Sequence, residues 1–244
     1  MSDHPEVSTN DLIEKKGVMF KKYSRTPFTG CSVEYHDNGQ LHYKENYKDG
    51  KKDGLSERYH ENGELWYTEN YKNGERDGLA TYYDKGNLMW KDNWKDGERD
   101  GLRESYDNGL LEGKENWKDG KLDGLSEYYY DNGQLWSVEN YKDGERDGLS
   151  ENYHDNGQLE ITGNWKDGKE DGLWKYYFDN GQLWSVKNYK DGKQDGLSEY
   201  YYDNGQLSAK VDWKDGKRQI KDYDEEGNLI ETQEYKEGRR IKKT

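Results

Sequence analysis

The stretch DGLSEYYYDNGQLWSVENYKDG, residues 123–144, decides the fold because the chain repeats it along most of its length. Each copy holds two glycine turns separated by eight to ten residues rich in Tyr, Trp and Leu. The first turn glycine recurs every 22 to 24 residues, at Gly39, Gly63, Gly86, Gly109, Gly133, Gly157, Gly181, Gly205 and Gly227. A fixed period of this length indicates a repeat architecture.

Both turns of each copy predict β-hairpins. Asn132-Gly133 and Asp143-Gly144 tolerate positive φ and favour two-residue type I′ turns. The segments between the turns have the length and composition of strands. The two prolines, Pro5 and Pro27, precede the regular array. We therefore predict an all-β fold, an elongated single-layer antiparallel β-meander of 22–24-residue hairpin repeats.

The repeat pattern also predicts the domain organisation. Residues 1–16 match no repeat, and we expect a flexible N-terminal tail there. Residues 17–240 are predicted to form a single repeat domain of about nine hairpins, with residues 241–244 as a basic C-terminal end. The last repeat replaces Asp-Gly-Leu with Arg218-Gln219-Ile220, so we expect atypical caps at both ends of the domain.

Comparison of the copies separates constant columns from variable ones. The columns of Leu125, Tyr129, Leu135 and Tyr141 keep their character in nearly every copy, and we expect them to pack together on one face. The opposite face varies and carries large rings, which are typical of protein interfaces. The candidate partner-binding residues are Trp66, Tyr82, Tyr128, Trp136, Tyr176, Phe178, Trp184 and Tyr200. A second interpretation stays open, in which these rings pack together and stiffen the sheet.

Composition limits the classes of partner. The formal net charge is -14, which argues against binding to nucleic acid or to an anionic membrane. The negative charge either attracts a basic protein or keeps an aromatic-rich sheet soluble. The 23 Tyr and 9 Trp residues supply the apolar area that the few aliphatic residues do not.

No pattern of reactive residues predicts catalysis, a metal site or a cofactor. The histidines do not have the spacing of a metal-ligand motif; they are His4, His36, His42, His60 and His154. Cys31 is the single cysteine and has no base nearby. The recurring aspartates are interpreted as turn formers rather than calcium ligands. We expect a protein that is not an enzyme. The first residues show no signal peptide and no apolar run is long enough to span a membrane, so we expect it in the cytoplasm.

One stretch resembles a known family. PFTGCSVEYHDNGQLHYKENYKDGKKDGLSERYHENGEL, residues 27–65, resembles the variant MORN repeat of bacterial YwqK-like antitoxin proteins. The marks are P-F-T-G, then E-Y-x-x-N-G-Q-L, then N-Y-K-D-G-K-x-D-G-L, and the resemblance extends over about residues 17–240. It implies a curved or twisted single-layer sheet with one groove-like face for binding. It also implies an immunity role, the capture of a toxic protein encoded nearby.

The leading hypothesis for function is a non-enzymatic, protein-binding repeat protein. We expect it to neutralise a toxin or effector, with a basic protein as partner and the variable aromatic face as binding surface. One alternative is a module that binds carbohydrate or another cell-surface ligand, because rings stack on sugars and surround quaternary ammonium groups. The other alternative is a membrane-associated scaffold.

Overall fold

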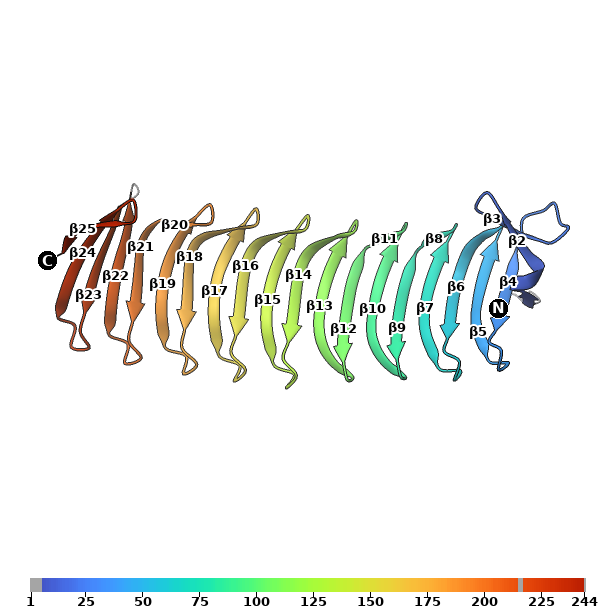
Figure 1. Ribbon diagram of the computed structural model, residues 1–244, viewed down its shortest axis with the longest axis horizontal. Coiled ribbons are helices and arrows are strands. Elements are labelled where there is room, and N and C mark those ends of the chain that lie inside the picture. Colours follow the sequence, from blue (N-terminus) through green and yellow to red (C-terminus); the bar gives the residue numbers. More distant parts are fainter. Residues whose placement is uncertain (1–5, 215–216, 244) are drawn as a thin grey trace. The chain divides into compact units, whose positions relative to one another are not determined.

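The chain divides into two compact units in the computed structural model, which describes residues 6–214 and 217–243. Unit 1 comprises residues 1–121 and unit 2 residues 122–244, and each consists of successive strands joined by short turns (Figure 1). The two units divide between them the residues for which the sequence predicted one domain. Residues 1–5 of the predicted tail and residue 244 of the predicted basic end lie outside the described residues.

Unit 1 consists almost entirely of strands. Its elements are β1 (Glu6–Ser8), the 3-10 turn η1 (Thr9–Asp11), β2 (Leu12–Lys15), β3 (Val18–Lys21), β4 (Gly30–Tyr35), β5 (Leu41–Lys48), β6 (Lys51–Tyr59), β7 (Leu65–Lys72), β8 (Glu75–Arg76), β9 (Gly78–Asp84), β10 (Asn87–Lys95), β11 (Glu98–Arg99), β12 (Gly101–Asp107) and β13 (Leu110–Lys118). From β4 onward the strands pair antiparallel in sequence order, with the short strands β8 and β9 both pairing with β7, and β11 and β12 both pairing with β10. By contrast, β1 adds to β4 in parallel.

Unit 2 continues the same hairpin pattern. Its strands are β14 (Lys121–Tyr129), β15 (Leu135–Lys142), β16 (Glu145–Tyr153), β17 (Leu159–Lys166), β18 (Lys169–Tyr177), β19 (Leu183–Lys190), β20 (Lys193–Gln194), β21 (Gly196–Tyr201), β22 (Leu207–Lys214), β23 (Lys217–Tyr223), β24 (Leu229–Lys236) and β25 (Arg239–Lys243). All of them pair antiparallel with sequence neighbours. The predicted all-β hairpin meander is confirmed.

Residues 6–15, assigned from the sequence to a flexible tail, form secondary structure. They carry β1, η1 and β2, and β2 pairs with β3. Leu12 is buried against Phe28 and Tyr47, and Met19 packs against this cluster. The Met19 amide also donates a hydrogen bond to the Gly50 carbonyl at 2.8 Å. The segment therefore packs on the first repeat, which the repeat pattern alone did not indicate.

The two kinds of turn differ in geometry. Asp143 and Gly144 both have positive φ, 51° and 91°, as a two-residue type I′ turn requires. The Asn-Gly turns of the 24-residue periods are longer. The Gly133 amide donates to the Tyr130 carbonyl and the Tyr130 amide to the Gln134 carbonyl, both at 2.8 Å. This is a type I turn followed by a G1 bulge, so the predicted type I′ geometry is wrong for these turns.

The 23-residue periods show what the extra residue does. Their first turns, at Lys85-Gly86 and Asn108-Gly109, have positive φ at both residues and are two-residue type I′ turns. A period of 23 residues therefore omits the residue that the G1-bulge turn needs. The loss is absorbed within the turn, and the flanking strands still pair.

Cross-strand pairing assigns the repeat columns to the two faces. In the β14–β15 hairpin, Ser126 lies opposite Glu139 and Tyr128 opposite Ser137, so these four side chains share a face. Tyr141 follows Glu139 by two residues and lies on the same face. We call this face, with the equivalent positions of the other repeats, the ladder face.

The opposite face, which we call the leucine face, carries Leu125 and Asn140 and their equivalents. Leu125 lies opposite Asn140 and is 40% exposed. The prediction that the Leu125 and Tyr141 columns pack together on one face is therefore wrong. A residue type that recurs in every copy is needed by every repeat, but the cross-strand pairing determines on which face of the sheet it lies.

The Asp-Gly-Leu motif is explained by a contact on the leucine face. Gly148 has φ +111°, and a Cβ there would lie 3.3 Å from Cβ of Asn140. The Asn140 side-chain amide donates a hydrogen bond to the Leu149 carbonyl at 2.8 Å. The glycine thus provides the close approach that lets one strand bind the backbone of the next.

Candidate functional site

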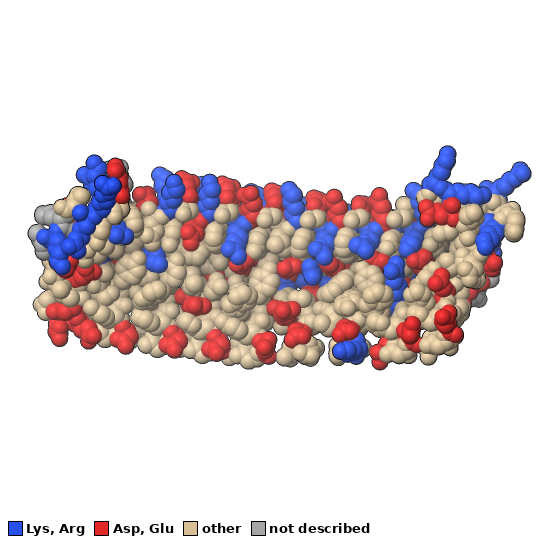
Figure 2. All heavy atoms as spheres, viewed as in Figure 1, with Lys and Arg blue, Asp and Glu red and all other residues tan. Residues whose placement is uncertain are grey.

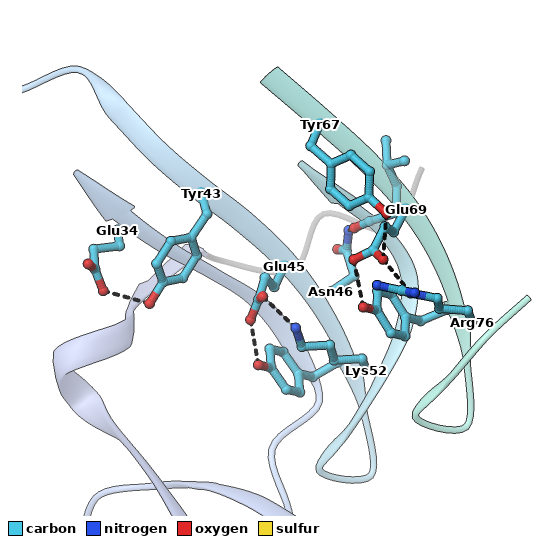
Figure 3. Close-up of polar contacts among 11 residues, drawn as sticks. Glu34, Tyr43, Glu45, Asn46, Lys52, Tyr67, Glu69 and Arg76 are labelled. Carbon is cyan, nitrogen blue, oxygen red and sulfur yellow. Dashed lines mark hydrogen bonds and ion pairs between the residues drawn. The ribbon is translucent and has the colours of Figure 1, made fainter. Parts of the chain in front are cut away.

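Ion pairs follow one another along the ladder face of unit 1. Each joins a cation to the carboxylate of the preceding strand, as in Lys52 with Glu45 (2.6 Å), Arg76 with Glu69, and Arg99 with Asp92 (3.0 Å). Figure 3 shows the first two pairs, with Glu45 beside Lys52 and Glu69 beside Arg76 and Tyr67. The carboxylates are buried; Glu69 is only 3% exposed.

Aromatic side chains complete this ladder. The Tyr67 and Tyr71 hydroxyls donate hydrogen bonds to Glu69 at 2.8 and 2.7 Å. Burial and the hydrogen bond to Glu69 raise the pKa of Tyr71 to about 12. The Arg76 guanidinium lies over the Trp94 ring, 4.7 Å from its centroid. These carboxylates are bound on several sides by their own chain, so their role in the fold is structural.

Unit 2 departs from this ladder after Glu139, where the carboxylate column continues as Gly163, Lys187 and Val211. Arg146 still pairs with Glu139 at 2.7 Å, but in the next copy Gly163 stands where the carboxylate was. Trp174, buried at 5% exposure, occupies the freed space, since a Cβ on Gly163 would lie 2.1 Å from its ring. Trp174 meets Trp165 edge-on at 5.4 Å. The small Gly163 and the large Trp174 thus compensate for each other in volume, and the ladder face remains closely packed.

The candidate residues Trp66, Trp136 and Trp184 each lie at a β-bulge. In β15 the register shifts between Ser137 and Leu135, so Trp136 has no residue opposite it on β14. The same shift occurs at the other two tryptophans. A bulge re-aims the side chain of the extra residue. Trp136 and Trp184 remain 45% and 42% exposed.

Six rings of unit 2 form two matched clusters. In the Trp136 cluster, the ring centroid of Trp136 lies 6.3 Å from that of Tyr128 and 6.4 Å from that of Tyr130. In the Trp184 cluster, the ring centroid of Trp184 lies 6.0 Å from that of Tyr176 and 6.4 Å from that of Phe178. The repeat between them has Asn152, His154 and Glu160 in the same columns. The clusters are therefore two repeats apart.

The remaining candidates lie elsewhere. In unit 1, the rings of Trp66 and His60 have centroids 5.4 Å apart, and Tyr82 stacks on Trp90 with ring centroids 5.7 Å apart. Tyr200, on β21 of unit 2, lies 5.8 Å from the ammonium of Lys187. The structure thus assembles the candidates of unit 2 more closely than Trp66 and Tyr82.

Sequence reasoning missed Tyr130 and its equivalents as structural contacts. The Tyr130 hydroxyl donates a hydrogen bond to the Tyr153 carbonyl of the next repeat at 2.7 Å, and the Tyr202 hydroxyl does the same to Tyr223 at 2.8 Å. Phe178 stands in this column and has no polar atom to offer. The signal in the sequence was that every copy with this position has His, Tyr or Phe there, up to Tyr202; the last copy has Asp224.

Acidic residues line the edge of unit 2 at which the Asn-Gly turns lie. Asp131, Asp155, Asp179 and Asp203 are all exposed there. Figure 2 shows Asp and Glu side chains spaced along this edge, at the bottom of the view. Unit 2, residues 122–244, contains 27 Asp and Glu against 18 Lys and Arg. The exposed rings thus lie in a unit with an excess of negative charge.

No group of three or more His, Cys, Asp and Glu side chains within residues 6–214 and 217–243 could hold a metal ion. Cys31 is buried, and this burial raises the pKa of its thiol. No helix in the described part of the chain combines the length and the apolar character that crossing a membrane needs.

Comparison with known proteins gives one family. The profile described as "MORN repeat variant" matches residues 28–49, 52–73, 122–143, 146–167, 170–191 and 194–215, more than half of the chain. No curated protein matches the sequence.

Two solved structures are similar over much of this chain. They are described as "Crystal Structure of TcdB2-TccC3-Cdc42" and "Crystal Structure of TcdB2-TccC3 without hypervariable C-terminal region", each at 13% identity with TM-scores of 0.21 and 0.22. The matches cover 86% and 89% of this chain but only 17% and 13% of those chains. At such TM-scores the similarity carries no argument about this protein.

Proposed function

The chain belongs to the MORN repeat variant family, and on this premise we propose that it is a non-enzymatic protein whose sheet holds a partner protein. The binding surface is the pair of aromatic clusters in unit 2. The finer role is that of an antitoxin or immunity protein, which neutralises a toxin or effector by occupying its surface. This finer role rests on the resemblance of residues 27–65 to the repeat of YwqK-like antitoxins.

One observation carries the proposal. Trp136 and Trp184 are placed by identical bulges, contact matched neighbours and stay nearly half exposed. Strands β15 and β19 are four steps apart in the sheet, so the two rings are separated by about 19 Å. Large exposed rings held by rigid strands are the residues that most often carry binding energy at protein interfaces.

The charge of unit 2 supports a basic partner. Its excess of Asp and Glu attracts a positively charged protein and speeds the encounter, more at low salt than at high salt. The proposed location is the cytoplasm, whose reducing conditions suit the free, buried thiol of Cys31.

The test is a comparison of three proteins expressed with a tag in the native host. Wild type, Trp136→Ala with Trp184→Ala, and Leu149→Ala with Leu197→Ala are purified in parallel, and co-purifying proteins are quantified by mass spectrometry. The two leucines are 42% and 46% exposed on the opposite face, so the third protein is a matched loss of exposed apolar area.

The proposal predicts one stoichiometric basic protein that the tryptophan variant loses and the leucine variant keeps. Equal retention by all three proteins, or the absence of any stoichiometric protein, contradicts it.

A further inference from the structure

Three aromatic rings of unit 2 surround one ammonium group. The Nζ of Lys187 lies 4.4 Å from the ring centroid of Tyr176 and 5.8 Å from those of Trp184 and Tyr200. The rings come from three strands, β18, β19 and β21. We call these three rings the cage.

Lys187 differs from the cations of the ladder. Lys52, Arg76 and Arg146 each form an ion pair with a carboxylate as well as lying over a ring. Lys187 stands in the column that carries Glu139 in an earlier repeat. Among the described residues, no carboxylate forms an ion pair with it. Its ammonium is therefore held mainly by ring faces.

A negative charge lies within electrostatic range of the cage. Glu170, on β18, stands in the column that carries the cation Arg146 in the preceding repeat. The column of the carboxylate Glu139 has Gly163 at the corresponding position. Burial raises the pKa of Glu170, and Lys187 lowers it in smaller part. The two residues have thus exchanged the usual signs of their columns.

We propose that the cage is a binding site for an organic cation, and that Lys187 fills it as a built-in occupant in the free protein. The ligands that fit are a quaternary ammonium group or the side chain of a lysine or arginine. The face of a ring attracts such cations, and several rings around one cation increase the attraction. Trp184 is 42% exposed, so the cage is open to solvent on the side of that ring.

The identity of the natural ligand, a basic side chain of the partner, rests on the proposed function, whereas the cage itself does not. If a partner lysine or arginine enters the cage, it replaces Lys187, and the displaced ammonium moves into water. This exchange makes the subsite selective, because an incoming cation has to compete with a resident one.

The test uses the full chain and tetramethylammonium chloride as the probe. Saturation transfer from the protein to the methyl protons of the probe is titrated at constant ionic strength, held with sodium chloride. Four proteins are compared: wild type, Lys187→Ala, Lys187→Ala with Trp184→Ala, and Lys175→Ala. Lys175 is an exposed lysine of β18 paired with Val186 on the leucine face, so its variant is a matched loss of one positive charge. Circular dichroism confirms that each variant is folded.

The proposal predicts that Lys187→Ala binds the probe at least tenfold more tightly than wild type, and that adding Trp184→Ala removes this gain. Lys175→Ala binds as wild type does. Equal affinity of wild type and Lys187→Ala overturns the proposal, as does a gain that survives the loss of Trp184 or that Lys175→Ala reproduces. No partner protein is needed, so failure of the proposed function and failure of the cage are distinguishable.

Discussion

Removal of Arg76 tests whether the ladder stabilises the sheet. Glu69 is 3% exposed, so Arg76→Ala leaves a buried carboxylate without its cation. Breaking a fully buried pair costs about 3–5 kcal/mol, and the cost is lower here because the Arg76 side chain is 41% exposed. The Tyr67 and Tyr71 hydroxyls still donate to Glu69, which reduces the cost, whereas the lost contact with Trp94 adds to it. We expect the free energy of unfolding to fall by about 2 kcal/mol.

The assay is urea unfolding followed by circular dichroism and by tryptophan fluorescence. The matched control is Lys44→Ala, because Lys44 and Glu6 form an ion pair of 2.8 Å in the same unit with 35% and 48% side-chain exposure. An exposed pair is worth at most about 1 kcal/mol. Adding Glu69→Gln to Arg76→Ala removes the stranded charge and restores part of the loss. The reasoning is refuted if Arg76→Ala costs no more than Lys44→Ala, or if Glu69→Gln makes the double variant less stable still.

Three further outcomes follow from the structure. Trp174→Ala opens a cavity under a ring that is 5% exposed and lowers the free energy of unfolding by about 3–5 kcal/mol in urea; a loss below 1 kcal/mol contradicts the packing described. The pKa of Tyr71 and of Tyr153 is raised to about 12, mainly by burial, so the fold favours the neutral phenols. The stabilisation that these neutral phenols provide is complete below pH 10 and is lost as the pH rises toward 12. In a pH titration, tyrosinate absorbance and the loss of circular dichroism should therefore appear together near pH 12. Ionisation of all tyrosines near pH 10 in the folded protein contradicts the raised pKa values. Phe178→Tyr adds a hydrogen bond to the next repeat and Tyr130→Phe removes one, and each change is worth about 1 kcal/mol. The melting temperature should therefore rise for Phe178→Tyr and fall for Tyr130→Phe. Shifts of the same sign in both variants disprove the stabilising hydrogen bond between repeats.

Much of the fold was predictable because turn chemistry and strand composition recur in every copy. The positive φ of Asp143 and Gly144 follows from the residue types alone. The Asn-Gly turns were assigned the wrong type because the dipeptide suits two geometries, and the extra residue before the turn decides between them. The ordered structure of residues 6–15 depends on the packing of Leu12 against Phe28 and Tyr47. This contact joins a non-repeating segment to the first repeat, so the repeat period does not predict it.

The candidate site was predictable only in part. Variation among copies drew attention to Trp136 and Trp184, which the structure shows to be exposed, but it gave no sign that each lies at a β-bulge. The assignment of constant columns to one face failed because constancy does not specify cross-strand pairing. Lys187 stands out in the sequence as a cation in a column of acids, yet only the structure places three rings around it.

In the proposed function, Trp136 and Trp184 belong to the surface of unit 2 that binds the partner. Isothermal titration calorimetry tests this by measuring the affinity of the isolated partner for wild type, for Trp136→Ala with Trp184→Ala, and for Leu149→Ala with Leu197→Ala. Loss of two interface hot spots of about 2 kcal/mol each, about 4 kcal/mol together, predicts an affinity roughly a thousandfold lower for the tryptophan variant, with an unchanged melting temperature. The leucine variant should bind within about threefold of wild type. If the tryptophan variant binds as tightly as wild type, the partner is held elsewhere and the account is contradicted.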